Sequence, residues 1–415
     1  MNNILRGAGI LAQSGGPTAV INSSAYGVIK TALEDPNVTR VLGAAHGIRG
    51  VLDDELYDMG KEDPYELSLL PGTPSSELGS VRYKMADPDK DDRDFKRILE
   101  IFKKYDVRYF FCIGGNDTMD TCEKISRFTE RSGYECRVIG IPKTIDNDLF
   151  GTDHCPGFGS AAKYIATSCM EVAKDARVYD AGMITVMEIM GRHAGWLAGS
   201  AALAAEFGSG PDFICLPEAE FDPERFFGKV KTLYEKQGNV FVAVSEGVRD
   251  RNGKFISEYF AGMISEKDAF GHLQLGGVAA NLAAEAKRRT GAKVRGIELS
   301  LLQRCASHLA SKTDADEAFA AGKAAVESAV SGETGKMVAF ERTGGKGAYL
   351  CGIKLVPLTE VANLEKKVPP EWITPEGDNV TKDFIGYVLP LIQGVPEHAV
   401  ENSLPRYARL KKIRA

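Results

Sequence analysis

The chain has 415 residues, enough for two or three domains, and 44% of them are hydrophobic, which supplies ample material for a core. Its 51 lysine and arginine residues against 57 aspartate and glutamate residues give a formal net charge of −6. This balance excludes a global positive field that would attract nucleic acid or an anionic membrane, so any anion must be bound by local groups.

Short apolar runs alternate with helix-length amphipathic segments along the chain. In chain order, this pattern predicts strands at 9–13, 107–113, 137–141, 183–188 and 240–245, and helices at 19–34, 118–131 and 160–176. The alternation is typical of βαβ units and predicts a parallel sheet covered by helices on both faces. Because ligands of open α/β sheets bind at the carboxyl ends of the strands, we expect the functional site there.

A loop rich in glycine, aspartate and proline, residues 150–159, marks a domain boundary. The predicted fold class is α/β, with two Rossmann-like three-layer α/β/α domains and a cleft between them. We place an N-terminal domain at 1–150, a second domain at 151–304 and a C-terminal extension at 341–415. Several prolines and a basic end predict irregular structure from Lys354 onward.

The eight cysteines show neither CxxC spacing nor the density of a secreted disulfide scaffold. We therefore expect reduced thiols in a cytoplasmic protein and no structural zinc site. The N-terminal apolar stretch ends at Gln13 and is too short for a signal peptide. The longest run of low charge, 194–205, is shorter than the ~20 apolar residues of a membrane span.

Two glycine-rich segments directly follow predicted strands. The sequence SGG occupies residues 14–16, and IGGNDTMDT occupies residues 113–121. Glycines that precede a helix let backbone N–H groups contact a phosphate, although Gly-Gly also forms tight turns. Asp and Thr are good helix N-caps, but three polar side chains in the second segment exceed what one cap requires. Both segments are candidate phosphate-binding loops, with a turn and a cap as the alternatives.

The segment GIPKTIDNDL, residues 140–149, is the most informative of the chain because it places one lysine and two aspartates after a predicted strand. In an extended loop Asp146 and Asp148 can face the same side, so that one carboxylate accepts a proton while the other holds Mg²⁺. Lys143 supplies positive charge for a phosphate. A solvated polar turn is the alternative, against which the position after a strand argues.

Two later segments carry groups suited to a phosphorylated sugar. In EIMGRHAGW, residues 188–196, Gly191 offers backbone access and Arg192 a bidentate fork for a phosphate or carboxylate. Glu246 follows the predicted strand 240–245 and suits a sugar hydroxyl. The alternative is a structural salt bridge, which is a more common role than ligand binding for a single arginine or glutamate.

Taken in order, the motifs SGG, PGT followed by Arg82, GGND, PKTIDND, MGR, SEG and LLQR resemble those of the phosphofructokinase family. The resemblance covers roughly residues 8–340, and PKTIDND together with MGR is highly specific. It implies reversible, Mg²⁺-dependent phosphoryl transfer to the 1-hydroxyl of D-fructose 6-phosphate in glycolysis. It also implies that residues 305–340 return to the N-terminal domain and that the chain forms a homodimer or homotetramer.

Two positions resemble the pyrophosphate-dependent branch of that family. Asp117 stands where ATP-using members have a glycine, and Lys143 stands where they have a glycine before TIDND. A carboxylate adds bulk and like-charge repulsion against ATP, while the lysine neutralises a short inorganic donor. The resemblance therefore implies diphosphate as the donor and phosphate as a product.

The resemblance also implies roles for the residues that match the family's motifs. Asp146 would be the catalytic base, Asp148 and Asp117 would hold Mg²⁺, and Lys143 and Thr144 would complete the catalytic group. The diphosphate pocket would contain Gly15, Gly16, Arg82, Asp117, Thr118 and Lys143. The sugar phosphate would contact Thr144, Asp146, Met190, Gly191, Arg192, Glu246, Arg304, His308 and Lys312.

Three positions depart from the pattern of bacterial relatives. Asn116 replaces an aspartate, so either one metal ligand is lost or Asp117 binds the metal in its place. Met183 replaces an arginine that, in bacterial ATP-using enzymes, reaches the active site from the neighbouring subunit. Either another cation takes the place of this arginine, or the binding pocket differs. Tyr26 replaces an arginine used for allosteric nucleotides, so control by ADP at that position is not expected.

Other functions remain open from the sequence. The chain could use ATP as a 6-phosphofructokinase, accept sedoheptulose 7-phosphate as well, or be a catalytically silent subunit that binds sugar phosphate. The presence of both Asp146 and Asp148 argues against a silent subunit. A nucleotide-dependent oxidoreductase lacks support, because no GxGxxG follows the first predicted strand.

Overall fold

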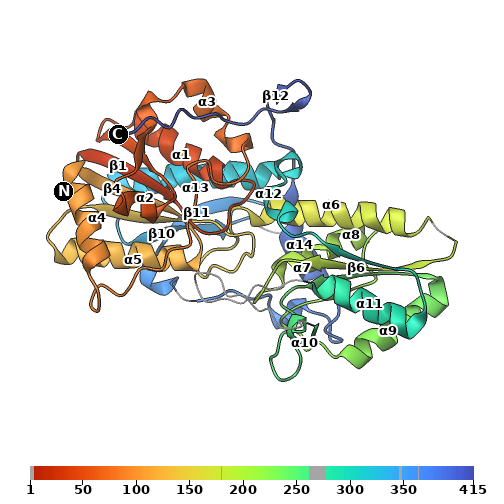
Figure 1. Ribbon diagram of the computed structural model, residues 1–415. Helices are drawn as coiled ribbons and strands as arrows, with labels where there is room; N and C mark the ends of the chain where they lie inside the picture. Colours follow the sequence, from red (N-terminus) through yellow and green to blue (C-terminus); the bar gives the residue numbers. More distant parts are fainter. Residues whose placement is uncertain (1–3, 179, 261–276, 345–347, 363) are drawn as a thin grey trace.

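The computed structural model describes residues 4–178, 180–260, 277–344, 348–362 and 364–415. They form two bodies, each built on its own sheet (Figure 1). Each strand and helix named in the sequence analysis is present, with ends that differ by no more than two residues. The predicted α/β class with two domains is confirmed.

The first sheet has seven strands in the order β11-β10-β5-β4-β1-β2-β3. Their bounds are β1 (Gly7–Gln13), β2 (Val38–Ala44), β3 (Leu56–Asp58), β4 (Val107–Gly114), β5 (Arg137–Pro142), β10 (Lys336–Arg342) and β11 (Cys351–Pro357). The five inner strands are parallel, whereas β3 and β11 pair antiparallel at the two edges. The parallel arrangement places the carboxyl ends of β1, β4 and β5 side by side.

Helices cover both faces of this sheet because neighbouring strand residues point to opposite sides. Leu11 and Phe111 pack on α1 (Ile21–Glu34) and α13 (Lys312–Val330). Ile10 and Phe110 pack on the other face, towards α4 (Arg93–Lys104) and α5 (Asn116–Arg131). The shorter helices of this body are α2 (Ile48–Leu52) and α3 (Pro64–Ser68), and α12 (Leu302–Cys305) packs on α6 (Phe158–Ala176).

The second sheet is parallel throughout and has the order β7-β8-β6-β9. Its strands are β6 (Met183–Ile189), β7 (Phe213–Cys215), β8 (Asn239–Ser245) and β9 (Val294–Glu298). One face packs on α6 (Phe158–Ala176), α7 (Trp196–Ser200), α8 (Ala202–Glu206) and α14 (Lys382–Val388). The other packs on α9 (Pro223–Gln237) and α11 (Val278–Thr290), and α10 (Ser257–Phe260) lies next to α11.

The expectation of irregular structure after Lys354 was wrong for two stretches. Strand β11 pairs with β10 over seven residues, because its backbone closes the open edge of the first sheet. Helix α14 buries Phe384 and Val388 in the core of the second body. The chain then returns through β12 (Val400–Glu401) and β13 (Leu404–Pro405) to the first body, where Arg414 pairs with Tyr57. The extension therefore contacts both bodies.

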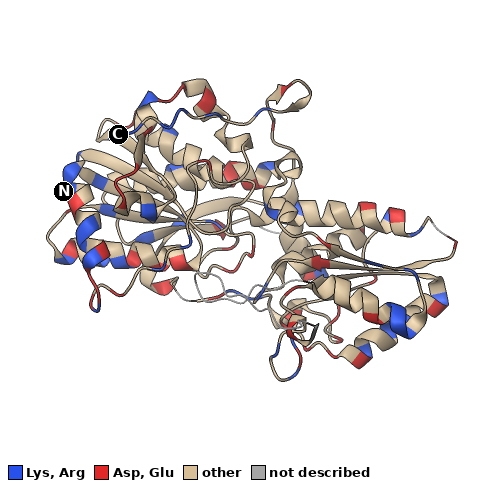
Figure 2. Ribbon diagram, viewed as in Figure 1, with Lys and Arg blue, Asp and Glu red and all other residues tan. Residues whose placement is uncertain are grey.

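Charges of both signs are interspersed on the outer helices of the two bodies (Figure 2). Among the residues that the structure describes, no helix combines the length and the apolar character needed to cross a membrane.

Two glycines allow α1 and α13 to cross with their backbones in close approach. A Cβ on Gly322 would lie 2.1 Å from the carbonyl oxygen of Ser24, and a Cβ on Gly27 would lie 2.2 Å from that of Phe319. Only glycine fits at such distances, so this crossing fixes the position of α13 against the first sheet.

We predict that Gly322→Ala lowers the free energy of unfolding by about 1–3 kcal/mol, because the added methyl group forces the two helices apart. Gly228→Ala is the matched control, since that helical glycine of α9 has no atom within 4 Å of its ideal Cβ. The control should raise stability by up to about 1 kcal/mol through helix propensity. Urea unfolding measures the free energy of unfolding of both variants. Equal changes in this free energy for the two variants would contradict the close crossing of α1 and α13.

Candidate functional site

The predicted motifs gather at the carboxyl ends of the strands of both sheets. SGG follows β1, GGND overlaps the end of β4 and the start of α5, and PKTIDND overlaps the end of β5. MGR follows β6, and SEG follows β8. The strands place these loops at one edge of each sheet, where parallel α/β sheets bind their ligands.

Lys143 joins the loop after β5 to the loop after β1. Its side chain is buried, and Nζ donates a hydrogen bond of 2.6 Å to the carbonyl oxygen of Gly16. Gly15 has a φ of 76°, and its ideal Cβ would lie 3.2 Å from Nζ. Burial lowers the pKa of Lys143 to about 8, against the opposing attraction of Asp146 and Asp148. The ammonium group therefore lies directly beside the two-glycine turn.

Asp146 is influenced by charged groups from both sheets. Its backbone N–H donates to Oγ1 of Thr144 at 3.1 Å, which fixes the start of the loop. Burial raises the pKa of Asp146 to about 7, and repulsion from Asp148 and Glu246 adds to this shift. Lys143 and Arg192 oppose it. A carboxyl group with a pKa near neutrality can accept a proton at physiological pH and later release it.

The MGR and SEG loops are held by specific backbone contacts. The N–H of Gly191 donates to Oε1 of Glu246 at 3.3 Å, and that of Met190 donates to Oε1 of Gln303 at 3.2 Å. Gly191 has a φ of 134°, and its Cβ would meet the carbonyl oxygen of Ala194 at 2.6 Å, so only glycine fits. Arg192 attracts the carboxylate of Glu246, whose pKa burial raises.

A second cation, Arg304 of α12, approaches the two-glycine turn. Nη1 of Arg304 lies 3.1 Å from the ideal Cβ of Gly16. Burial lowers the pKa of Arg304, the charge of Arg82 lowers it further, and Asp146 opposes the shift. Lys143, Arg304 and Arg82 thus concentrate positive charge where the sequence predicts an anion.

The start of α5, next to the backbone of Lys143, also carries oxygen atoms. Thr118 is buried, and its Oγ1 would lie 2.0 Å from a Cβ on Gly114, which explains the glycine there. Asp117 is exposed in the first helical turn. Oδ1 of Asn116 is buried and has no hydrogen-bond partner within the described ranges. Such a carbonyl oxygen and the neighbouring carboxylate of Asp117 are ligand types that a hard cation such as Mg²⁺ prefers.

Two predicted sugar-phosphate ligands make no contact with this group among the described residues. His308 is exposed in a short 3₁₀ helix, Ser307–Leu309, near His398. Lys312 is exposed at the start of α13, where its Nζ pairs with Oδ2 of Asp316 at 2.5 Å. No contact within the described part of the chain joins either side chain to Asp146, so their assignment stays a prediction.

Residues of the C-terminal extension that lie in no recognised motif support the PKTIDND loop. The backbone N–H of Lys366 donates to the carbonyl oxygen of Asp148 at 2.7 Å. Its partly buried ammonium group donates to the carbonyl oxygens of Asp153 and Thr152, at 2.6 and 3.2 Å. Leu149 forms an isolated antiparallel bridge with Glu365. The extension thus braces the loop that carries both aspartates.

Asn147, between the two aspartates, is fixed in the same way. It adopts a φ of 54°, and its Nδ2 donates to the hydroxyl oxygen of Tyr387 at 2.8 Å. Its Oδ1 accepts from the N–H of Cys155 at 3.0 Å. The left-handed backbone at this residue turns the chain between the carboxylates, and asparagine tolerates that conformation better than most residues.

Sequence and structure comparisons agree on the kind of protein that this chain resembles. The Phosphofructokinase family model matches residues 8–313. The pyrophosphate--fructose 6-phosphate 1-phosphotransferases of Halomonas elongata and Xanthomonas campestris pv. campestris are 42% and 44% identical to it. Each match covers 97% of this chain and 96% of the relative.

A crystal structure of pyrophosphate-dependent phosphofructokinase from Marinobacter aquaeolei superposes with a TM-score of 0.88 at 39% identity. That match covers 99% of this chain and 97% of the other. The phosphofructokinase of Saccharomyces cerevisiae, at 18% identity and a TM-score of 0.66, shares the fold.

Glu188, at the end of β6, gives a prediction about pH. Burial raises its pKa to about 7, with repulsion from Glu298 and Glu246, while the N–H of Ala279 donates to its Oε2 at 2.9 Å and opposes the shift. The folded chain then keeps a proton that the unfolded chain releases above about pH 4.5. Stability therefore falls as pH rises from about 4.5 to 7, on the order of 3 kcal/mol for this group.

We predict that Glu188→Gln removes this part of the pH dependence, because the amide oxygen still accepts from Ala279 and carries no charge. Urea unfolding at pH 5 and pH 8 measures the difference between variant and wild type. Glu235→Gln, at an exposed position of α9, is the control and should leave the profile unchanged. A Glu188→Gln profile parallel to that of the wild type would refute the assignment.

Proposed function

This chain belongs to the phosphofructokinase family, and on that premise we propose that it transfers a phosphoryl group from diphosphate to the 1-hydroxyl of D-fructose 6-phosphate. The products are D-fructose 1,6-bisphosphate and phosphate, and the reaction is reversible. The observation that carries the choice of donor is the buried ammonium group of Lys143, hydrogen-bonded to Gly16 beside the two-glycine turn.

The charges around the two-glycine turn support a short, highly charged donor. Lys143 and Arg304 both approach Gly15 and Gly16, where the terminal phosphates of a donor would lie. Lys143 also occupies the space next to Gly15, because its Nζ would lie 3.2 Å from a Cβ at that glycine. Asp117, exposed at the start of α5, repels a longer polyphosphate chain. The negative charges of two linked phosphates can pair with these cations, and no nucleoside is needed for that interaction.

Asp146 is proposed as the base that takes the proton from the sugar 1-hydroxyl. Its pKa of about 7 suits both removal of that proton and its return in the reverse reaction. Lys143 and Arg192 attract the charged form, and Thr144 holds the backbone of the loop in place. In this mechanism the oxygen of the hydroxyl attacks the terminal phosphorus, and the bond from that phosphorus to the bridging oxygen breaks.

Asp148 and Asp117 would hold Mg²⁺, and Asn116 would offer its carbonyl oxygen, which has no hydrogen-bond partner among the described residues. When bound, Mg²⁺ supplies charge neutralisation at the diphosphate oxygens. Burial raises the pKa of Asp148, and the charge of Glu365 adds to this shift, whereas a hydrogen bond from Thr144 and the charge of Lys366 oppose it.

The sugar phosphate is proposed to contact residues of both bodies. Glu246, fixed by the N–H of Gly191, would accept from sugar hydroxyls, and Arg192 and Arg304 would contact phosphate oxygens. Gln303 is a positioning residue, because it holds the backbone of Met190. The exposure of His308 and Lys312 is compatible with a role across a subunit interface of the proposed homodimer or homotetramer.

We predict that Asp146→Asn lowers kcat by about 10²- to 10⁴-fold, because the amide cannot accept the proton, with little change in fructose 6-phosphate binding. A coupled aldolase assay measures kcat, and equilibrium titration measures sugar-phosphate binding. Asp92→Asn, at a partly exposed ion pair with Lys96, is the matched control and should retain wild-type kcat. A near-normal rate for Asp146→Asn would remove this residue from the mechanism.

The donor is tested by the same assay with diphosphate and ATP offered separately. The wild type should use diphosphate, and Lys143→Gly should raise the KM for diphosphate at least tenfold more than that for fructose 6-phosphate. ATP use should not appear in Lys143→Gly, because Asp117 remains, but should appear when Asp117→Gly is combined with it. Comparable rates of the wild type with ATP and diphosphate would overturn the donor assignment.

A further inference from the structure

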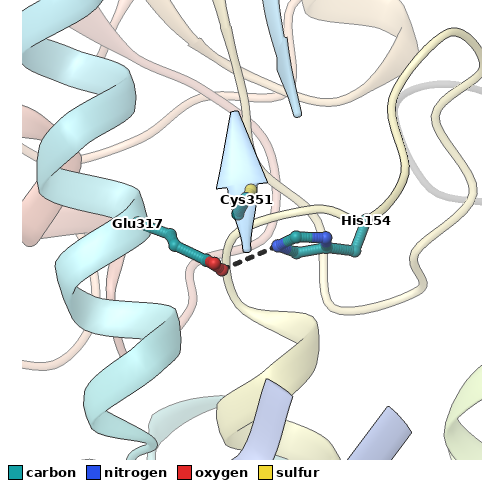
Figure 3. A group of neighbouring side chains, drawn as sticks. All are labelled: His154, Glu317 and Cys351. Carbon is teal, nitrogen blue, oxygen red and sulfur yellow. Dashed lines mark hydrogen bonds and ion pairs between the residues drawn. The ribbon is translucent and has the colours of Figure 1, made fainter. Parts of the chain in front are cut away.

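Three side chains from distant parts of the chain meet beside the first sheet, outside the site proposed for phosphoryl transfer. His154 lies in the loop between β5 and α6, Glu317 in α13, and Cys351 at the start of β11 (Figure 3). The nearest Nε2, Oε and Sγ atoms of the three all lie within 4.8 Å of one another. His154 is buried, whereas Glu317 and Cys351 are partly exposed.

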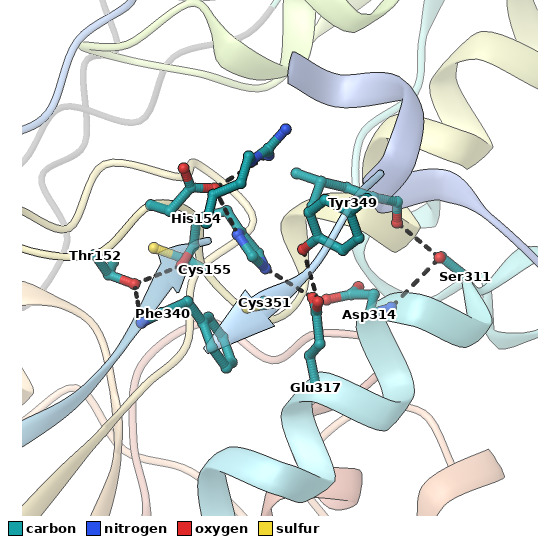
Figure 4. Close-up of polar contacts among 12 residues, drawn as sticks. Thr152, His154, Cys155, Ser311, Asp314, Glu317, Phe340, Tyr349 and Cys351 are labelled. Atoms are coloured by element: carbon teal, nitrogen blue, oxygen red, sulfur yellow. Dashed lines mark hydrogen bonds and ion pairs between the residues drawn. The ribbon is translucent and has the colours of Figure 1, made fainter. Parts of the chain in front are cut away.

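The imidazole of His154 is oriented in the way that metal-binding histidines usually are. Its Nδ1 lies 2.9 Å from Oδ1 of Asp153, which also accepts from Nη2 of Arg342 at 3.1 Å. The ring stacks on Phe340, with centroids 4.8 Å apart (Figure 4). With Nδ1–H donating to a carboxylate, Nε2 is directed at the other ligand atoms.

The carboxylate of Glu317 is also fixed by a neighbour. Its Oε1 accepts from the hydroxyl of Tyr349 at 2.6 Å, and its Oε2 lies 2.7 Å from Nε2 of His154. One oxygen is thereby used in positioning, and the other faces the imidazole (Figure 4). Sγ of Cys351 makes a weak contact of 3.6 Å with the carbonyl oxygen of Gly352.

From this geometry we propose that His154, Glu317 and Cys351 bind one thiophilic divalent transition ion of the Zn²⁺ class. The combination of imidazole, carboxylate and thiolate favours Zn²⁺ or Co²⁺ and disfavours Mg²⁺, which prefers oxygen ligands. The site is therefore chemically distinct from that of Asp148 and Asp117. A water molecule completes a tetrahedron.

The binding step requires small movements and balances in charge. Around a tetrahedral Zn²⁺, the N, O and S ligand atoms lie about 3.3–3.6 Å from one another. Nε2 and Oε2 would therefore move apart by about half an ångström. The two ligand atoms that are farthest apart would approach each other by about one ångström. The proton between Nε2 and Oε2 and the thiol proton of Cys351 both leave to water. The carboxylate and the thiolate then neutralise the two positive charges of the ion.

Such an ion would fix the loop that follows Asp146 and Asp148. His154 lies in the same loop as the proposed catalytic aspartates, whereas Glu317 and Cys351 belong to the chain's later return to the first sheet. The ion would join segments of the first body that lie before and after the second body in the sequence. We expect it to stabilise the folded chain and not to take part in phosphoryl transfer.

The test uses the purified full-length chain, treated with a chelator, returned to buffer with Mg²⁺ and a reductant, and titrated with Co²⁺. We expect a thiolate-to-cobalt charge-transfer band and intense visible bands of four-coordinate cobalt, saturating at one equivalent. Zn²⁺ should abolish the bands, and excess Mg²⁺ should not. Zn²⁺ should also raise the Tm.

Cys351→Ser should lose the charge-transfer band and the rise in Tm. Cys305→Ser is the matched control, since Cys305 is the other partly exposed cysteine among the described residues, and it should keep both. His154→Gln should weaken Co²⁺ affinity at least tenfold. Failure of the wild type to develop the band, or its persistence in Cys351→Ser, would overturn the proposal and leave the cluster as a hydrogen-bonded network.

Discussion

The hydrogen bond from the buried ammonium group of Lys143 to the carbonyl oxygen of Gly16 ties the site together. It connects the loops after β1 and β5, which carry the donor-binding turn and the catalytic aspartate. A buried ammonium group is costly unless its charge is compensated, and Asp146 and Asp148 provide that compensation without forming a direct ion pair with it. The same arrangement leaves Lys143 able to interact with an incoming anion.

Repulsion among carboxylates is the other force that shapes this region. Burial, together with repulsion from neighbouring carboxylates, raises the pKa of Asp146 and of Glu188, near the ends of strands from different sheets. These groups cost stability in the absence of ligand, which is typical of sites built for binding and catalysis. A bound cation and the positively charged side chains reduce that cost. The fold tolerates it because the two sheets and their helices are densely packed.

The fold and the centre of the site could be predicted from the sequence because they depend on local patterns. Strand periodicity located β4 and β5, and the motif at residues 143–148 identified the loop of Asp146. Lys366 could not be found in this way, because it supports Asp153 from 213 residues further along the chain and lies in no motif. Gln303 was within a recognised motif, but only the structure shows its contact with Met190. The trio of His154, Glu317 and Cys351 has no spacing that a sequence pattern detects.

The order in which the first body is assembled has a consequence for synthesis on the ribosome. Strands β1, β4 and β5 emerge early, but α13 and β10, which complete the sheet and cover one face, begin only at Lys312 and Lys336. At a typical elongation rate of 5–20 residues per second, about 10–40 s separate the end of β5 from the start of β10. During that interval Leu11, Phe111 and Ile139 lack the covering that α13 later supplies. The nascent chain is therefore most exposed to aggregation while its second body is being translated, and chaperone capture in that window would favour recovery of the folded protein.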